Sequence, residues 1–303
     1  MALKDVKVKI AGVGKTKQIT KAMYMVSSAK LRGSQQRIER FRPYADKFRE
    51  VLEELAGNAG GNVHPLLADR PEPKTACIVL ITSDRGLCGG FNANLIKVAL
   101  KLAREKQAQG RAVRFLCVGR KGRDAVGKAG FEVIPGGSGG LADFDFSLAA
   151  RIGESVVKDF LEETTDEVLL VYAEFISMGR QVPITASLLP MKSFSTEKPG
   201  GADQKSAQAH KAESTKGSVD YIYEPEVEEL LAEILPRYIK VQVYRGLLDT
   251  AASEHAARMS AMDNATRNCD EITRTLTLLY NKARQSAITT ELIDIVAGAD
   301  ALQ

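Results

Sequence analysis

The sequence predicts an α/β protein in which a long antiparallel coiled coil of N- and C-terminal helices carries a central βαβ domain with a mostly parallel sheet. Three observations predict this architecture. Apolar residues recur at helical seam spacing at both ends of the 303-residue chain, the two ends carry opposite net charge, and strand-like and helix-like segments alternate between them. We expect an N-terminal coiled-coil helix over residues 1–58, an α/β domain over 74–223 and a C-terminal coiled-coil helix over 224–303.

The C-terminal segment is the stronger of the two helix predictions. From Arg237 to Gln303 the chain has no proline, and its only glycines are Gly246 and Gly298. A helix of this length spans roughly 100 Å, so it cannot bury itself against its own domain and needs a partner along its length. Its apolar and small residues follow alternating steps of three and four, which keeps one narrow seam on one side of the helix. The predicted seam is Leu248, Ala252, His255, Met259, Met262, Thr266, Cys269, Ile272, Leu276, Leu279 and Ala283.

The N-terminal segment supplies the expected partner. Its net charge over residues 1–56 is +7, whereas that of residues 224–303 is −5, so the two helices should pair within one chain and run antiparallel. Pro43 lies inside the helical pattern and predicts a kink or a local break near Arg42. The predicted seam of this helix is Ile19, Met23, Val26, Lys30, Ile38, Phe41, Ala45, Phe48, Leu52 and Leu55.

The middle of the chain alternates between strand and helix patterns. Continuous apolar or alternating runs predict strands, and amphipathic spacing predicts the helices between them, which is typical of βαβ units. Residues 195–218 are rich in Lys, Ser, Gly and Ala, so we expect a mobile loop before Tyr221-Ile222-Tyr223 re-enters the fold. The predicted strands are 76–82, 112–118, 131–134, 167–173 and 182–189, and the predicted helices are 95–107, 120–128 and 146–162.

Composition narrows the class of protein. The chain is 44% hydrophobic with a net charge of +4, and this mild charge argues against bulk nucleic-acid binding. No apolar run approaches the ~18 residues that a membrane span needs, and the N-terminus has no signal-peptide core. The four cysteines show no CxxC spacing, which favours reduced thiols in a cytosolic compartment.

Two glycine-rich motifs resemble phosphate-binding loops. Gly12-Val13-Gly14-Lys15-Thr16 looks like the tail of a P-loop, but Lys9 stands where the first glycine of that motif belongs, and no buried strand precedes it. Ser83–Asn92 (SDRGLCGGFN) follows the first predicted strand, where dinucleotide sites occur, yet its glycines do not follow the GxGxxG spacing. We interpret the first as part of a long helix and favour a tight structural turn over an anion cradle for the second.

Other candidate sites carry weaker signals. The segment from Gly119 to Arg123 has two glycines and three cations, which fits a solvated turn better than a phosphate site. The three histidines have no neighbours at metal-ligand spacing, and Cys88 has no base nearby in sequence. The residues therefore predict no catalytic, cofactor or metal site.

Several motifs together make the sequence similar to a known family. They are Gln18–Met23 with Met25-Val26 and Ser28–Lys30, Arg42–Tyr44, Ser83–Asn92, Tyr223–Pro225, Ser253–Met259, Asn281–Gln285, Ile288–Leu292 and Gly298-Ala299. With these residues the chain resembles the gamma subunit, the central shaft, of rotary F-type ATP synthases, over essentially its whole length. Residues 195–218 look long for that family, and the cysteine-pair insert of light-regulated chloroplast members is not apparent, which favours a bacterial form.

This resemblance implies a chain without bond chemistry or cofactor. Its partners would be the alpha and beta subunits of the catalytic ring, the epsilon subunit and the membrane c-ring, and it would lie at the cytoplasmic face of the bacterial inner membrane. The resemblance also implies that Met23, in the basic segment with Lys21, should lie near polar residues of the partner helix that meet the ring. Those residues are Arg258, Gln285, Thr289, Glu291 and Asp294.

Two other classes stay open at this point. A nucleotide-dependent oxidoreductase would explain the βαβ core, but it would leave the two terminal helices without a role. A coiled-coil scaffold or nucleic-acid-associated protein would explain the rod and its basic N-terminal helix, but not the α/β domain between them. The sequence leaves the coupling ion, the net direction of the reaction, the c-ring stoichiometry and the role of residues 195–218 undetermined.

Overall fold

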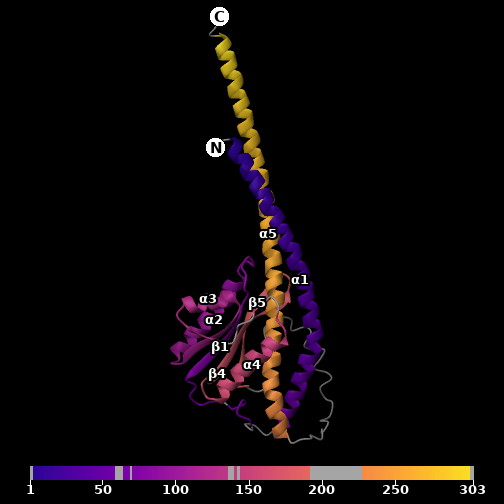
Figure 1. The fold of residues 1–303 in the computed structure, drawn as a ribbon, viewed down its shortest axis with the longest axis vertical. Helices are drawn as coiled ribbons and strands as arrows, with labels where there is room; N and C mark the ends of the chain where they lie inside the picture. The colour runs from indigo at the N-terminus through magenta and orange to yellow at the C-terminus, as the bar shows by residue number, and fades with distance from the viewer. Residues whose placement is uncertain are drawn as a thin grey trace, which may run out of the picture.

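The computed structural model describes residues 3–58, 64–68, 70–135, 140–141, 144–191 and 227–300. Two long helices dominate it: α1 (Leu3–Asn58) and α5 (Val227–Asp300). They lie side by side and antiparallel, so both termini point toward the same end of the molecule, with the C-terminus extending beyond the N-terminus (Figure 1). The α/β domain flanks the lower half of this pair. The predicted antiparallel coiled coil with a central sheet domain is therefore confirmed.

The helix α1 passes through Pro43 without interruption, so the predicted local break is wrong. Aromatic packing on both sides of the proline explains why the helix continues. Phe41 meets Tyr244 of α5 edge-on at 4.9 Å between ring centroids, and Phe48 stacks on Tyr238 at 6.2 Å. Each such pair contributes about 0.5–1.5 kcal/mol beyond its buried area, which offsets part of the roughly 3 kcal/mol that a proline costs inside a helix.

The lower part of the predicted α1 seam is correct, and its upper part is wrong. Ile19 and Val26 are 61% and 57% exposed, and Lys30 is also exposed. Met23 is half-buried. The side chains that face α5 at this level include polar ones, which the apolar pattern did not select. They are Lys17, Thr20, Tyr24, Ser27 and Leu31, and from Ile38 the observed seam joins the predicted one.

The predicted α5 seam holds as far as Cys269 and again at Leu276 and Ala283, but it is wrong at two positions between them. Ile272 and Leu279 are 48% and 50% exposed. Thr273 and Tyr280 are less exposed and take their places in the helix pair. Both corrections have the same physical reason: each helix has two stripes at coiled-coil spacing, and the more apolar stripe is not always the inner one.

The central sheet has five strands in the order β3-β2-β1-β4-β5. The first four are parallel and β5 runs antiparallel to β4, as a mostly parallel sheet predicts. The strands are β1 (Thr75–Ile81), β2 (Ala112–Val118), β3 (Glu132–Ile134), β4 (Glu167–Ser177) and β5 (Arg180–Leu189). The helices between them are α2 (Phe91–Ala108), α3 (Arg120–Lys128) and α4 (Phe146–Leu161).

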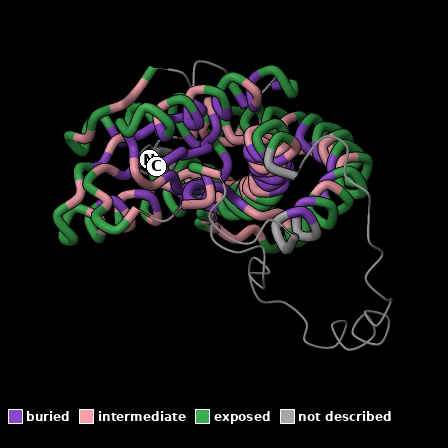
Figure 2. Tube along the Cα trace, turned by 90° about the horizontal axis from the view of Figure 1, so that it is seen from below, coloured by how far each residue is buried: buried purple, intermediate pink, exposed green. Residues whose placement is uncertain are grey.

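The two faces of the sheet have separate cores. One face packs against α4, α5 and the lower part of α1, and side chains such as Val79 and Leu170 point into it. The other packs against α2 and α3 through side chains such as Leu80 and Phe115. In the view along the shaft, buried residues gather inside the domain and where the helices meet it (Figure 2). The alternation of β1, β2 and β4 between two covered faces explains their continuous apolar sequences.

Close approach ties α5 to the domain. A Cβ atom at Gly153 of α4 would lie 2.7 Å from Cγ of Lys240 and 3.3 Å from its Cα, and one at Gly246 would lie 3.1 Å from Leu170. A larger residue at Gly153 would force Lys240 to move, and one at Gly246 would be tightly packed against Leu170. No helix in the described part of the chain combines the length and the hydropathy needed to cross a bilayer. The predicted loop over residues 195–218 lies outside the described residues.

Candidate functional site

The position where doubly wound sheets bind nucleotides is filled by α5. In such sheets ligands bind at the carboxyl ends of the strands, where the chain continues to opposite sides, here between β1 and β4. The pairing of β1 with β4 ends at Val171. Two residues later the N–H of Ala173 donates to Oγ1 of Thr250 (3.2 Å), and Oγ of Ser253 donates to the carbonyl of Ala173 (3.3 Å). Side chains of α5 thus continue the hydrogen bonding where β1 stops.

The SDRGLCGGFN segment forms a tight turn beside this junction. Ser83 donates from its hydroxyl to the carbonyl of Arg85 (2.6 Å), and its N–H donates to the side-chain oxygen of Asn92 (3.1 Å). The carboxylate of Asp84 accepts the N–H groups of Arg120 and Leu141, both at 3.1 Å. The N–H groups of Ser83 and of Arg120, Lys121 and Gly122 at the α3 N-terminus therefore already have partners within the chain, which supports a structural turn.

A buried ion pair on α5 holds the other side of this turn. Arg258 donates from Nη2 to Oε1 of Glu254 (2.6 Å), and from Nη2 and Nε to the carbonyl of Gly86 (3.3 and 3.4 Å). Burial raises the pKa of Glu254, and the bond from Arg258 opposes that shift. The Arg258 side chain thus connects the turn of the α/β domain to the long helix α5.

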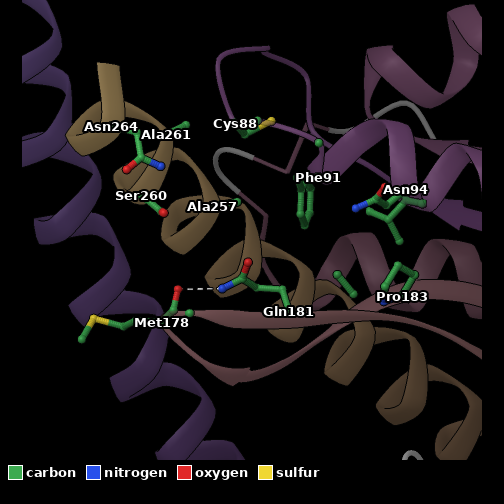
Figure 3. Close-up of a pocket in the computed structure, with 15 residues that line it drawn as sticks. Cys88, Phe91, Asn94, Met178, Gln181, Pro183, Ala257, Ser260, Ala261 and Asn264 are labelled. Atoms are coloured by element: carbon green, nitrogen blue, oxygen red, sulfur yellow. Dashed lines mark hydrogen bonds between the residues drawn. The ribbon is translucent and has the colours of Figure 1, made fainter. Parts of the chain in front are cut away.

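An open hollow of about 260 Å³ lies beside the turn (Figure 3). Its walls are the turn itself, the first turn of α2, the tip of the β4–β5 hairpin and small residues of α5. Gln181 crosses its floor and donates to the carbonyl of Met178 (2.8 Å). The thiol of Cys88 lies on its wall, and burial raises the pKa of that thiol, so it stays protonated and packed. The hollow holds no pair of groups arranged for acid–base or nucleophilic chemistry.

The other glycine motif is part of α1. Residues 12–16 are helical, and Thr16 donates to the carbonyl of Gly12 at 3.2 Å, as threonine does within a regular helix. A phosphate-binding loop needs backbone N–H groups that are free of helical hydrogen bonds. The helical interpretation of this segment is confirmed.

The antiparallel register separates the predicted coupling residues. Lys17 pairs with Asp270 (2.5 Å), and Thr20 contacts Thr266 (2.8 Å), so Met23 lies level with residues near 263. At about 1.5 Å per residue, Gln285 is roughly 33 Å further along α5. The expectation that Met23 lies near the polar residues of the upper helix is therefore wrong for Gln285, and more so for the three that follow it. Those three are Thr289, Glu291 and Asp294, all exposed.

Arg258 is also placed differently from expectation. It lies within about two turns of the level of Met23, but its side chain is buried against the turn and is 11% exposed. Lys21 is exposed on α1. Sequence reasoning missed Glu254 and Gly86 as partners of Arg258. The i, i+4 spacing of Glu254 and Arg258 is the only signal that could have paired them.

A long antiparallel helix pair attached to an α/β domain, with one of its helices filling the ligand crevice of the sheet, defines a shaft-like class of protein. The family model described as ATP synthase matches residues 2–302. The chain is 60% identical over 302 residues to the ATP synthase gamma chain of Nitratidesulfovibrio vulgaris strain Hildenborough, covering 100% of this chain and 99% of that one. It is 51% identical, with the same coverage, to the gamma chain of Lawsonia intracellularis.

Solved structures agree with these relatives. The chain is similar to the central stalk of the Tetrahymena thermophila mitochondrial ATP synthase, at 28% identity and TM-score 0.56 over 82% of this chain and 99% of that one. It shares its fold with a chain of the Euglena gracilis enzyme at 19% identity and TM-score 0.63, covering 99% and 94% of the two chains. The chain belongs to the ATP synthase family. Within it the chain is a noncatalytic subunit with the role of the rotary central shaft.

Proposed function

We propose that the chain transmits torque between an ion-driven membrane c-ring and catalytic sites on beta subunits. It would turn inside a ring of alpha and beta subunits, with the epsilon subunit beside its α/β domain, at the cytoplasmic face of a bacterial inner membrane. The observation that carries this proposal is the projecting end of α5. The register of the Lys17–Asp270 pair puts Leu3 level with about residue 284, and beyond this level α5 continues as a single helix (Figure 1).

The projecting end suits a bearing. Its large apolar side chains are about half to two-thirds exposed, which is unusual for a helix without a partner. Few charges interrupt them, so a surrounding apolar collar could cover the helix without holding it at one angle by ion pairs. The exposed apolar residues are Ile288, Leu292, Ile293, Ile295 and Val296.

A second partner surface follows the outer side of α1. Val8, Ile19 and Val26 are between 57% and 66% exposed and lie on the side opposite the α5 seam. Lysines flank them, as expected for contacts with acidic groups of a neighbour. Met23 and Lys21 lie beside this stripe, so we propose that they meet the catalytic ring at this level.

The remaining predicted coupling residues would act at two other levels. We propose that Gln285, Thr289, Glu291 and Asp294 meet the ring at the projecting end of α5, and that Arg258 acts where the shaft leaves the α/β domain. Contacts at several heights allow one orientation of the shaft to favour one state of a catalytic subunit. Converting a 1:99 population to 99:1 takes about 5.5 kcal/mol of differential interaction.

Photo-cross-linking in the assembled enzyme tests this function. A benzoylphenylalanine at Thr289 should capture alpha or beta subunits and stop both ATP hydrolysis and ATP-driven ion pumping after illumination. The same group at Glu233, which is exposed near the opposite end of α5, serves as the matched position and should capture neither alpha nor beta subunits. If the Thr289 adduct forms and the enzyme still pumps at full rate, the chain does not rotate within the ring.

A further inference from the structure

The turn beside the shaft presents a leucine in an unusual backbone conformation. Leu87 has a φ of 62°, and its side chain is 64% exposed. Left-handed backbone is rare for a bulky residue that is neither glycine nor asparagine. Such strain persists only where surrounding structure fixes it, and it concentrates at sites of contact or switching. A large apolar side chain held outward in this way indicates a surface contact.

The α/β domain fixes one side of the turn. The carboxylate of Asp84 is bonded to the N–H groups of Arg120 and Leu141, and Ser83 is bonded to Arg85. These bonds hold the residues before Leu87 to the carboxyl ends of the strands. They leave Leu87 itself outward, next to the exposed Arg85.

The shaft fixes the other side. Arg258 of α5 reaches the carbonyl of Gly86 and is itself held by Glu254. Further along the turn, a Cβ atom at Gly89 would lie 3.9 Å from Cβ of Ala261, so the turn packs directly on α5. The Arg258–Glu254 pair is only 11% and 8% exposed. A buried pair is weak evidence of added stability, because desolvation offsets much of its attraction, so its geometry points to a positioning role.

We propose that Arg258, held by Glu254, is a positioning residue that locks the Leu87 turn to the shaft, so that Leu87 forms a rigid contact for a partner subunit. This inference rests on the proposed shaft function and changes how Arg258 takes part in it: Arg258 acts through Leu87 and touches no partner itself. Arg85 and Lys121 border Leu87, since a Cβ atom at Gly86 would lie 4.0 Å from Cε of Lys121. The partner surface is therefore an apolar socket with carboxylates at its rim.

The same helix offers a matched control. Asp263 and Arg267 have the same i, i+4 spacing and the same 2.6 Å bond, but their side chains are 40% and 75% exposed. This bond joins two residues of α5 to each other. Replacing Arg267 removes an ion pair of equal geometry from α5 and should leave the turn unchanged.

The first measurement is hydrogen exchange over residues 84–90 in the assembled enzyme. Arg258→Gln should raise exchange there by about tenfold or more, since a hydrogen bond from a charged group is lost. Arg258→Lys should restore part of the protection, and Arg267→Gln should match the parent chain. Unchanged exchange in Arg258→Gln would show that the pair does not hold the turn.

The second measurement is ion pumping per ATP hydrolysed in the same membranes. Leu87→Ala, a surface change that leaves the core intact, should lower this ratio, and Arg258→Gln should lower it similarly. The double variant should be no worse than either single one, because both act on one contact. Additive losses, or a normal ratio in Leu87→Ala, would overturn the inference. Normal coupled pumping by the parent complex would still support the shaft function in that case, so the two failures are distinguishable.

Discussion

The hydroxyl oxygens of Thr20 and Thr266 lie 2.8 Å apart, although 246 residues separate them in the sequence. Next to them, Lys17 and Asp270 form an ion pair across the same two helices. A polar layer inside a helix pair specifies register, because a shift of either helix would leave these groups without partners. The shaft is therefore fixed along its length by chemistry as well as by apolar packing.

Cysteines in this layer should cross-link within one chain. Thr20→Cys with Thr266→Cys places two thiols where two hydroxyls now touch, which suits disulfide geometry. Oxidation of the assembled enzyme should give an intrachain bond, visible as altered mobility of the chain on nonreducing gels. Ile19→Cys with Thr266→Cys is the matched pair and should not react, because Ile19 faces outward. Cross-linking between separate chains instead would contradict the antiparallel hairpin.

The architecture could be predicted from sequence because its signals are long. Seam spacing over dozens of residues, opposite charges and regular strand–helix alternation all indicate the same topology. The strand Ala112–Val118 and the helix Arg120–Lys128 have the bounds that the pattern predicted. Element ends are less certain: α2 begins four residues before the predicted helix, at Phe91, where the turn residue Gly90 precedes it.

The choice of the inner stripe could not be predicted from periodicity alone. Ile19 and Val26 repeat at seam spacing as well as Thr20 and Ser27 do, and they are more apolar. What decides the outcome lies elsewhere in the chain: Thr266 and Asp270 supply partners for the polar residues of α1. The apolar outer stripe matches a surface for other subunits, which a single sequence does not contain. The hydrogen bond from Arg258 to Gly86 could not be predicted either, because 172 residues separate the two and no local pattern connects them.

His255 should weaken the fold on acidification. Burial and the cations Arg258 and Lys30 lower its pKa from 6.5 to about 4, and its Nδ1 has no hydrogen-bond partner among the described residues. The unfolded chain then binds the proton more readily, so stability is lost as pH falls from about 6.5 to about 4, by up to about 3 kcal/mol. In urea unfolding of the purified chain, the stability of His255→Leu relative to the parent should rise as the pH falls from 7 to 4.5. Parallel profiles would show that His255 is solvated.

Asp249 should act in the opposite direction. Burial raises its pKa from 3.8 to about 6, and Nε of Arg245 lies 3.9 Å from its Oδ2. The raised pKa favours the folded chain fully below about pH 3.8, and this advantage is lost as the pH rises through about 6. The free energy of unfolding falls by up to about 3 kcal/mol over this range. Asp249→Asn should therefore stabilise the purified chain at pH 7.5 and have little effect near pH 4.

Comparison of the two single variants gives the sharper test. His255 and Asp249 change the free energy of unfolding over overlapping pH ranges and in opposite directions. Between pH 4 and pH 6 the free energy of unfolding should therefore change less with pH in the parent chain than in either variant. His255→Leu should gain stability on acidification, and Asp249→Asn should lose it. A parent profile as steep as both variants would mean that other groups dominate this range.

Met23 and Glu291 test whether distant levels of the shaft act on one partner state. They are too far apart along the helix pair for direct contact, so in the purified chain the effects of Met23→Lys and Glu291→Gln on unfolding should add.

In the assembled enzyme, Met23→Lys places a cation beside the outer stripe, where a carboxylate of the ring could hold one orientation too tightly, by about 1–3 kcal/mol. It should hydrolyse ATP and pump poorly, whereas Met23→Leu, which adds no charge, should pump normally. If both levels bias the same catalytic subunit, Glu291→Gln should shift the pumping deficit of Met23→Lys rather than add to it. Strict additivity in pumping, with hydrolysis unchanged, would mean that the two levels act on separate states and that coupling between them does not pass through the ring.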